Sequence, residues 1–145
     1  MGLKENYSGK TIFIDTAPLI YYIEGHSVYN EKLRAFFESV DDGDVILQTS
    51  VLTLLEVLVQ PIRLKRLKLA HKYETILTSS PNIEIYDIDL ETSRRAAELR
   101  ANYNLKTPDA LQIAMGIEKN ANSFLTNDYE LNRVREIHIL TLEEL

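Results

Sequence analysis

The sequence predicts an open α/β sandwich, in which a central parallel sheet of about five strands is covered by helices. Short β-branched runs alternate with longer helical patterns, which is the order expected of consecutive βαβ units. The chain has 145 residues, enough for one domain with a substantial core. It is too short for a TIM barrel, which needs roughly 250 residues. We therefore expect a single domain over residues 1–145.

Each expected strand is a short apolar run bounded by turn or capping residues. The five runs are 11–14, 45–48, 83–86, 123–126 and 137–140. Helical patterns fill the intervals, over 18–24, 29–40, 51–59, 63–77, 90–103 and 108–119. Ser50 and Thr107 are expected to begin two of these helices as caps, and Asp42-Gly43 to close another. Pro61 is expected to separate the third helix from the fourth.

The composition excludes several classes of protein. Without cysteine there is no disulfide framework, thiolate zinc site or cysteine nucleophile. The first six residues are too polar for a signal peptide, and no apolar run approaches the ~18 residues that a membrane span needs. We expect a soluble, cytoplasmic protein with no membrane partner. The formal net charge of −6 argues against a protein that covers nucleic acid with basic residues.

Four carboxylates stand near the points where strands of such a sheet give way to helices. Asp15 follows the first strand and Asp128 follows the fourth, while Glu56 and Asp109 lie within two turns of a helix start. Each has an ordinary structural explanation. Asp15 and Asp128 would serve as helix caps, and Asp109 would complement a helix dipole. Glu56 is the one charge of an apolar helix that we expect to be mostly buried, with Glu56 facing solvent or a cleft.

The four carboxylates gain a common explanation if they converge. In open α/β sheets the ligand site lies beyond the carboxyl ends of the strands, where all four are expected. Clustered negative charges repel and raise one another's pKa values unless cations neutralise them. Oxygen ligands with no His or Cys nearby favour Mg²⁺ or Mn²⁺ over zinc. Two such ions would activate water and stabilise the leaving oxygen of a phosphodiester. Without these four carboxylates the formal net charge would be −2, so the acidity of the chain comes partly from the site itself.

The segments around these four carboxylates, taken in their order along the chain, resemble the acidic landmarks of the PIN-domain nucleases. The similarity extends over essentially the whole chain, and the length is most like that of the VapC-type ribonuclease toxins of toxin-antitoxin pairs. The matching segments are Ile14-Asp15-Thr16-Ala17-Pro18, Leu55-Glu56-Val57, Pro108-Asp109-Ala110-Leu111 and Leu125-Thr126-Asn127-Asp128.

The resemblance implies a three-layer α/β/α sandwich and a Mg²⁺- or Mn²⁺-dependent endoribonuclease that leaves 5′-phosphate and 3′-hydroxyl ends. It also implies a homodimer and a cognate antitoxin that silences the enzyme. The residues that match the acidic quartet and would hold the metals are Asp15, Glu56, Asp109 and Asp128. Supporting roles near the site fall to Thr16, Thr126 and Asn127.

One basic segment is a candidate for contact with RNA. Lys65, Lys68 and Lys72 are expected on one face of the helix over 63–77, where they would meet RNA phosphates. A solvated helix face explains the same spacing without any ligand. The three lysines are therefore candidates on spacing alone.

Three other functions are alternatives to the nuclease. An aspartyl-phosphate phosphatase would need a second Asp two positions after Asp15, where this chain has Ala17. A dinucleotide-binding domain would need a Gly-x-Gly-x-x-Gly motif, which is absent. A PIN-like fold without activity, acting as a binding or scaffold module, remains open.

Overall fold

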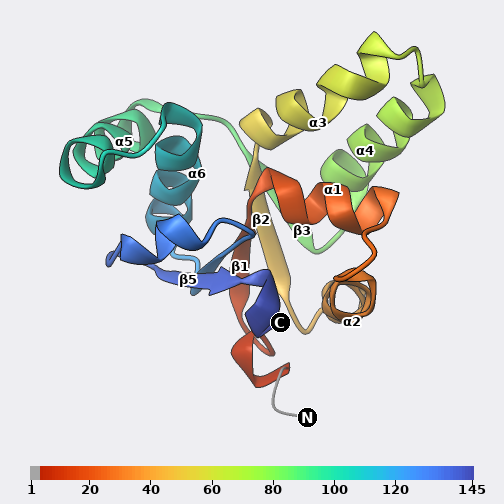
Figure 1. The fold of residues 1–145 in the computed structure, drawn as a ribbon, viewed down its shortest axis with the longest axis horizontal. Coiled ribbons are helices and arrows are strands. Elements are labelled where there is room, and N and C mark those ends of the chain that lie inside the picture. Colours follow the sequence, from red (N-terminus) through yellow and green to blue (C-terminus); the bar gives the residue numbers. More distant parts are fainter. Residues whose placement is uncertain (1–3) are drawn as a thin grey trace.

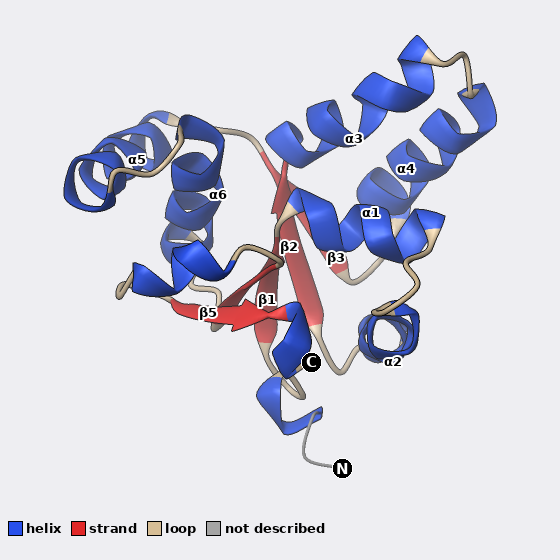
Figure 2. Ribbon diagram, in the orientation of Figure 1, coloured by secondary structure: helices blue, strands red, loops and turns tan. Residues whose placement is uncertain are grey.

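All five expected strands form, and each boundary lies within two residues of its expected position (Figure 2). The computed structural model describes residues 4–145. Its strands are β1 Thr11–Ile14, β2 Ile46–Ser50, β3 Ile83–Tyr86, β4 Ser123–Thr126 and β5 His138–Thr141. Its helices are α1 Thr16–Glu24, α2 Asn30–Asp41, α3 Val51–Arg63, α4 Leu67–Ser79, α5 Leu90–Tyr103 and α6 Thr107–Glu118. Short 3₁₀ turns are η1 Lys4–Asn6, η2 Tyr129–Arg133 and η3 Leu142–Glu144.

The sheet is parallel throughout, with the strand order β3-β2-β1-β4-β5. The order reverses between β1 and β4, since the chain builds outward from β1 on one side and from β4 on the other. Ile14 of β1 pairs with Leu125 of β4, so the residues that follow these strands emerge side by side. Parallel α/β sheets bind their ligands at such a reversal, beyond the carboxyl ends of the strands.

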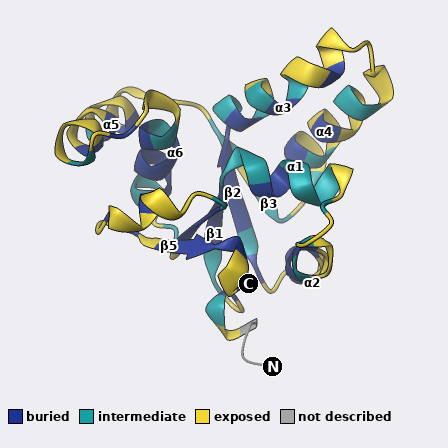
Figure 3. Cartoon of the chain, in the orientation of Figure 1, coloured by how far each residue is buried: buried dark blue, intermediate teal, exposed yellow. Residues whose placement is uncertain are grey.

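Helices cover both faces of the sheet, which gives the expected three layers (Figure 1). Side chains of a strand alternate between faces, and β1 follows this rule. Ile12 and Ile14 belong to the core beneath α1 to α4, whereas Phe13 belongs to the core beneath α5 and α6. Strands β1, β2, β4 and β5 are mostly buried, whereas β3 at the edge of the sheet is only partly buried (Figure 3). The α/β fold class predicted from the sequence is therefore confirmed.

Helix α6 lies close against the sheet because the residues on its inner face are small. Ala110, Ala114 and Gly116 are all buried. A Cβ atom at Gly116 would lie 3.3 Å from both Phe13 Cβ and Ile137 Cδ1, a separation that few side chains tolerate. This packing fixes the height of α6 above β1, and Asp109 lies in the first turn of the same helix.

Pro61 does not separate α3 from α4, which corrects the sequence prediction. Helix α3 continues through Pro61 to Arg63. It ends at a left-handed residue, Lys65 (φ 57°), where the Arg66 N–H donates to Pro61 O and the Lys65 N–H to Ile62 O. This pair of bonds is a Schellman motif, which satisfies the last carbonyls of a helix. The fourth helix therefore begins at Leu67 and not near residue 63, so Lys65 does not share a helix with Lys68.

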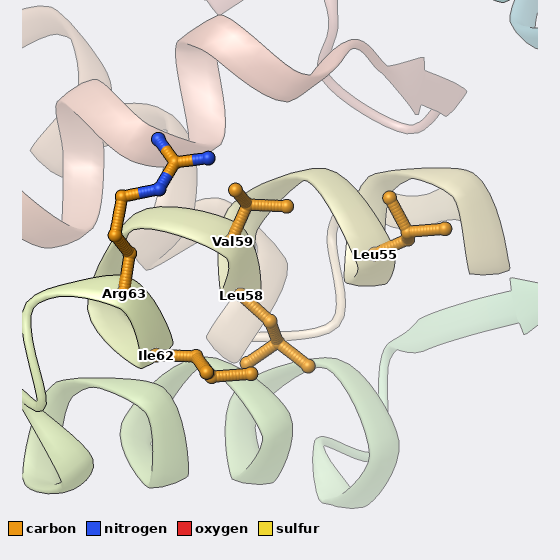
Figure 4. A pocket seen from close by; sticks show the side chains of 5 residues that line it. All are labelled: Leu55, Leu58, Val59, Ile62 and Arg63. Atoms are coloured by element: carbon orange, nitrogen blue, oxygen red, sulfur yellow. The ribbon is translucent and has the colours of Figure 1, made fainter.

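Helix α3 is also less buried than its composition suggests. Leu55 is 60% exposed and Ile62 is 58% exposed, because no element of residues 4–145 packs against that side of the helix. Together with Leu58, Val59 and Arg63 they line an open apolar groove of about 600 Å³, whose lining side chains are shown in Figure 4. The expectation of a mostly buried helix is wrong for this face.

Two further expectations need qualification. Thr107 is the first residue of α6 and not its cap, since Lys106 occupies the N-cap position without a side-chain hydrogen bond. The first three of the residues judged too polar for a signal peptide lie outside the part of the chain that the structure describes. Across residues 4–145, no helix combines the length and apolar character that crossing a membrane would require.

Candidate functional site

Asp15 stands at the reversal of strand order, with both carboxylate oxygens held. It caps α1, and its Oδ1 accepts the Thr16 N–H at 2.9 Å. Its Oδ2 accepts the hydroxyl of Thr126, the last residue of β4, at 2.9 Å. Asp15 thus caps α1 as expected, and the β1–β4 register brings the Thr126 hydroxyl within hydrogen-bond distance of it.

The environment of Asp15 disfavours its charged form. Burial is the main cause, and the negative charges of Asp109 and Glu56 act in the same direction. The hydrogen bonds from Thr16 and Thr126 oppose the shift, yet the pKa of Asp15 still rises to about 6. A strongly shifted carboxyl at the ligand-binding edge of a sheet is typical of a functional site.

Glu56 is brought to the same edge by the first two turns of α3. It is partly buried, and its Oε1 accepts a short hydrogen bond of 2.6 Å from the Thr16 hydroxyl. This bond joins the start of α1 to α3 and leaves Oε2 available. The supporting hydrogen bond expected of Thr16 is thus made to Glu56, and Glu56 faces the other carboxylates and not open solvent.

Asp109 and Asp128 share a small polar cavity of about 110 Å³ beside this pair. Asp128 caps η2 by accepting the Glu130 N–H at 3.0 Å, and its side chain is exposed. Burial raises the pKa of Asp109, and the charge of Asp128 adds to the shift. Together with the charges felt by Asp15, this effect links the four carboxylates in one electrostatic cluster.

Two cations beside Asp109 were not among the candidates from the sequence. Lys106 and Arg133 line the same cavity, and both charges oppose the rise in the pKa of Asp109. Arg133 is also tied to the backbone, because it donates to the carbonyls of Tyr103 and Glu130. Only the position of Lys106 directly before α6 could have suggested its role; nothing in the spacing links Arg133 to Asp109.

The remaining candidates make no hydrogen bond to the four carboxylates among those found for the described residues. The Asn127 Nδ2 donates to the Tyr21 hydroxyl at 3.2 Å, so Asn127 fastens the loop after β4 to α1. Lys65 follows the C-terminal end of α3, nine residues beyond Glu56 in the sequence. Lys68 and Lys72 lie on α4, which packs against α3.

The chemistry of the donor set decides which divalent cation it could hold. All four side chains offer oxygen atoms, and hard cations such as Mg²⁺ and Mn²⁺ prefer oxygen. Among residues 4–145, however, no three His, Asp or Glu side chains are arranged to hold one ion together. The chemistry of the donors therefore fits such an ion, while coordination by three protein ligands would require the carboxylates to move closer.

A parallel α/β sandwich with acidic residues at the carboxyl ends of its strands defines the class to which this chain belongs. The model of the PIN domain matches residues 12–137, and the chain is a member of the PIN domain family. No curated protein sequence matches this chain significantly.

Solved structures with the same fold include toxins and their complexes. The VapBC2 complex of Rickettsia felis bound to promoter DNA has a chain with a TM-score of 0.73 at 18% identity, which covers 90% of this chain and 98% of that one. A toxin-antitoxin complex from Klebsiella pneumoniae gives 0.71 at 20% identity, covering 90% and 97%. VapC20 of Mycobacterium tuberculosis, which cleaves the sarcin-ricin loop, gives 0.67 at 16% identity, covering 88% and 98%.

Proposed function

We propose that this protein is a metal-dependent endoribonuclease that hydrolyses RNA phosphodiester bonds with two divalent ions, Mg²⁺ or Mn²⁺. The observation that carries the proposal is the gathering of Asp15, Glu56, Asp109 and Asp128 at the reversal of strand order, where burial and neighbouring carboxylates raise the pKa of Asp15. Repulsion between these negative charges lowers stability in the absence of cations, and bound cations would neutralise it. Membership of the PIN domain family supports the same conclusion.

In this proposal Asp15, Glu56, Asp109 and Asp128 hold the ions. Bound there, the ions would lower the pKa of the attacking water and stabilise the charge on the phosphate. The chain's own contribution is to orient the carboxylates. Thr126 and the backbone of Thr16 hold Asp15, and the hydroxyl of Thr16 holds Glu56.

Basic side chains near the cluster would guide the RNA. Lys106 is exposed at the mouth of the cavity beside Asp109 and is available to a phosphate. Lys65, Lys68 and Lys72 would contact phosphates a few nucleotides from the cleaved bond, along the hairpin of α3 and α4. Phosphate contacts of this kind add affinity that falls as salt rises.

We further propose that the protein is the toxin of a toxin-antitoxin pair. Its fold is that of VapC20 and of chains in two toxin-antitoxin complexes. The partners in this proposal are an RNA substrate, a cognate antitoxin and a second copy of the chain. A cytoplasmic location would give access to all three.

The test is an RNA cleavage assay with purified protein, with Mn²⁺ or Mg²⁺ and with EDTA. Cleavage that requires the ion and is lost in both Asp15→Asn and Asp109→Asn would support the proposal. The variants also control for a contaminating ribonuclease, because a contaminant would cleave equally in every preparation. Absence of metal-dependent cleavage of any RNA pool would refute the enzyme.

A catalytically silent PIN-like binding module is the second candidate. It is favoured by one observation, that no three carboxylates of residues 4–145 are arranged to hold an ion. A silent module would bind RNA equally well with Mn²⁺ and with EDTA and would leave it intact. The same assay, followed by gel shift, separates the two functions.

A further inference from the structure

Beneath the carboxylates lies a cluster of buried polar side chains that carry no charge. Ser50 ends β2, Thr53 lies in the first turn of α3, and Gln112 lies in α6. Each is at most 1% exposed. Buried polar groups are retained only when they are hydrogen-bonded, and these three bond to one another.

The contacts form a chain that ends at Glu56. The Ser50 hydroxyl donates to Gln112 Oε1 at 2.5 Å, and Gln112 Nε2 donates to Thr53 Oγ1 at 2.6 Å. Thr53 Oγ1 lies 3.4 Å from Thr16 Oγ1, and Thr16 donates to Glu56.

Proton counting gives the chain a single direction. Thr16 has one hydroxyl proton, which it donates to Glu56, so its contact with Thr53 is made with Thr53 as the donor. Thr53 is free to donate because it accepts from Gln112. Every member therefore donates toward the Glu56 carboxylate, and hydrogen bonds aligned in this way strengthen one another.

We propose that Gln112 and Thr53 are positioning residues that hold Glu56 through Thr16. The inference rests on the proposed function, because it gives this network a role in the metal-binding site. Gln112 lies one turn after Asp109 on α6, and Thr53 lies one turn before Glu56 on α3. The amide of Gln112 thus links the two helices that carry these carboxylates and sets how Glu56 is presented when an ion binds.

A purely structural role would give a different pattern of effects. If the network only held α3 to α6, its loss would lower the melting temperature and leave metal affinity unchanged in the folded protein. A positioning role predicts weaker metal binding and a lower kcat, with little change in KM for RNA. Groups that orient metal ligands commonly change affinity or activity by about 10-fold to 100-fold when removed.

The test compares Thr53→Val with Thr53→Ser in the full chain. Val removes the hydroxyl, whereas Ser keeps it. Titration calorimetry with Mn²⁺ should show about tenfold weaker binding in Thr53→Val and binding within about threefold of wild type in Thr53→Ser. The kcat should follow the same order, with KM for RNA within about twofold.

Gln112→Met provides a second variant at a different point of the network. It fills a similar volume without the amide and should weaken Mn²⁺ binding like Thr53→Val, even if its melting temperature falls. Mn²⁺ affinity equal to wild type in folded Thr53→Val and Gln112→Met would overturn the proposal. Equal losses in Thr53→Val and Thr53→Ser would also overturn it, because the hydroxyl would then not matter.

Failure of the proposed function and failure of the positioning role give different experimental results. Wild-type protein that binds Mn²⁺ yet cleaves no RNA would refute the nuclease and leave the positioning role to be decided by the binding data. Wild-type protein that binds no Mn²⁺ would overturn both.

Discussion

The junctions after β1 and β4 begin alike and end in different environments. In both, a strand is followed by an Asp that caps the next helical turn, with its Oδ1 accepting a backbone N–H. Asp15 is partly buried, accepts a second hydrogen bond from Thr126, and has its pKa raised to about 6. Asp128 is exposed on the rim of a small cavity.

The difference comes from what surrounds each junction. Asp15 follows the central strand, with β2 on one side and β4 on the other, and α3 brings Glu56 toward it. Asp128 follows β4 and is flanked by the exposed residues of η2. A similar capping motif therefore places its Asp where burial raises the pKa at one junction and on an exposed surface at the other.

The largest expected effect is on catalysis. Asp15→Asn should lower kcat/KM for RNA by about 10³-fold or more, because Asp15 interacts with two other carboxylates of the cluster. Asp128→Asn should lower kcat/KM by about tenfold to 100-fold, because the charge of this exposed side chain raises the pKa of Asp109 but is not among the causes of the raised pKa of Asp15. Cleavage rates in saturating Mn²⁺ measure both. Equal losses would mean that burial does not distinguish the two junctions.

The second prediction concerns stability and pH. The pKa of Asp15 is higher in the folded protein than the ordinary value of 3.8, so folding is favoured by its protonated form. This stabilisation is complete below about pH 4 and is lost as pH rises through about 6. At pH 7 without metal, Asp15→Asn should therefore be more stable than wild type by up to about 3 kcal/mol, and at pH 4 the gain should vanish.

Urea unfolding at the two pH values measures this difference. Asp128→Asn is the matched control, since Asn is also a good helix cap, and it should change the free energy of unfolding by less than about 0.5 kcal/mol. A gain for Asp15→Asn that persists at pH 4 would assign the effect to something other than the Asp15 charge.

The third prediction uses metal to reverse the cost of the buried charge. Saturating Mn²⁺ at pH 7 should stabilise the wild type by about 2–3 kcal/mol at 100 times the dissociation constant, by mass action. Asp15→Asn should gain much less from the same concentration, because it lacks one carboxylate. Melting curves with Mn²⁺ and with EDTA provide the measurement, and identical curves for the wild type would argue against an ion at this edge.

The fourth prediction addresses the hydroxyl that connects the two junctions. Thr126 Oγ1 donates to Asp15 Oδ2 and accepts the Asp128 N–H at 3.1 Å. Thr126→Val should cost about 1–2 kcal/mol of stability, whereas Thr126→Ser should keep most of it. Chemical denaturation measures the free energy of unfolding of the two variants. Equal values for Thr126→Val and Thr126→Ser would show that the shared hydroxyl does not couple the junctions.

The smallest effect is expected far from both junctions. Ile62→Lys places a charge on the exposed side of α3 and should change stability by less than about 0.5 kcal/mol. RNA cleavage by this variant should equal that of wild type. A clear drop in melting temperature would mean that the apolar face of α3 contributes to the fold of the single chain.

Local patterns were enough to predict the strands and to place the four carboxylates at one edge of the sheet, while their role as metal ligands stays a prediction. Each strand is marked by a short apolar run, and the topology of a parallel sheet then brings Asp15 and Asp128 to one edge. The hydrogen bond between Gln112 and Thr53 joins positions 59 residues apart, so no local pattern contains it. The role of Arg133 escaped prediction for the same reason, since it depends on the fold and not on spacing.

Two local signals also gave wrong expectations. Pro61 lies inside α3, which continues two residues beyond it, and the left-handed Lys65 ends the helix instead. The apolar residues of α3 suggested burial on every side. Periodicity identifies an apolar face, but it does not say whether another element of the same chain covers that face.

The absence of a side chain at Gly116 lets α6 pack closely against the sheet and so affects where Asp109 lies. Seven residues separate Gly116 from Asp109, about 10 Å along the axis of α6, so one end of the helix is set by contact with Phe13 and the other end carries the charge. A methyl group at position 116 would lie 3.3 Å from both Phe13 Cβ and Ile137 Cδ1, so these side chains or the helix would have to shift slightly. Asp109 and Gln112 lie on the same helix as Gly116. The position of these two side chains therefore depends on a residue that has no functional group of its own.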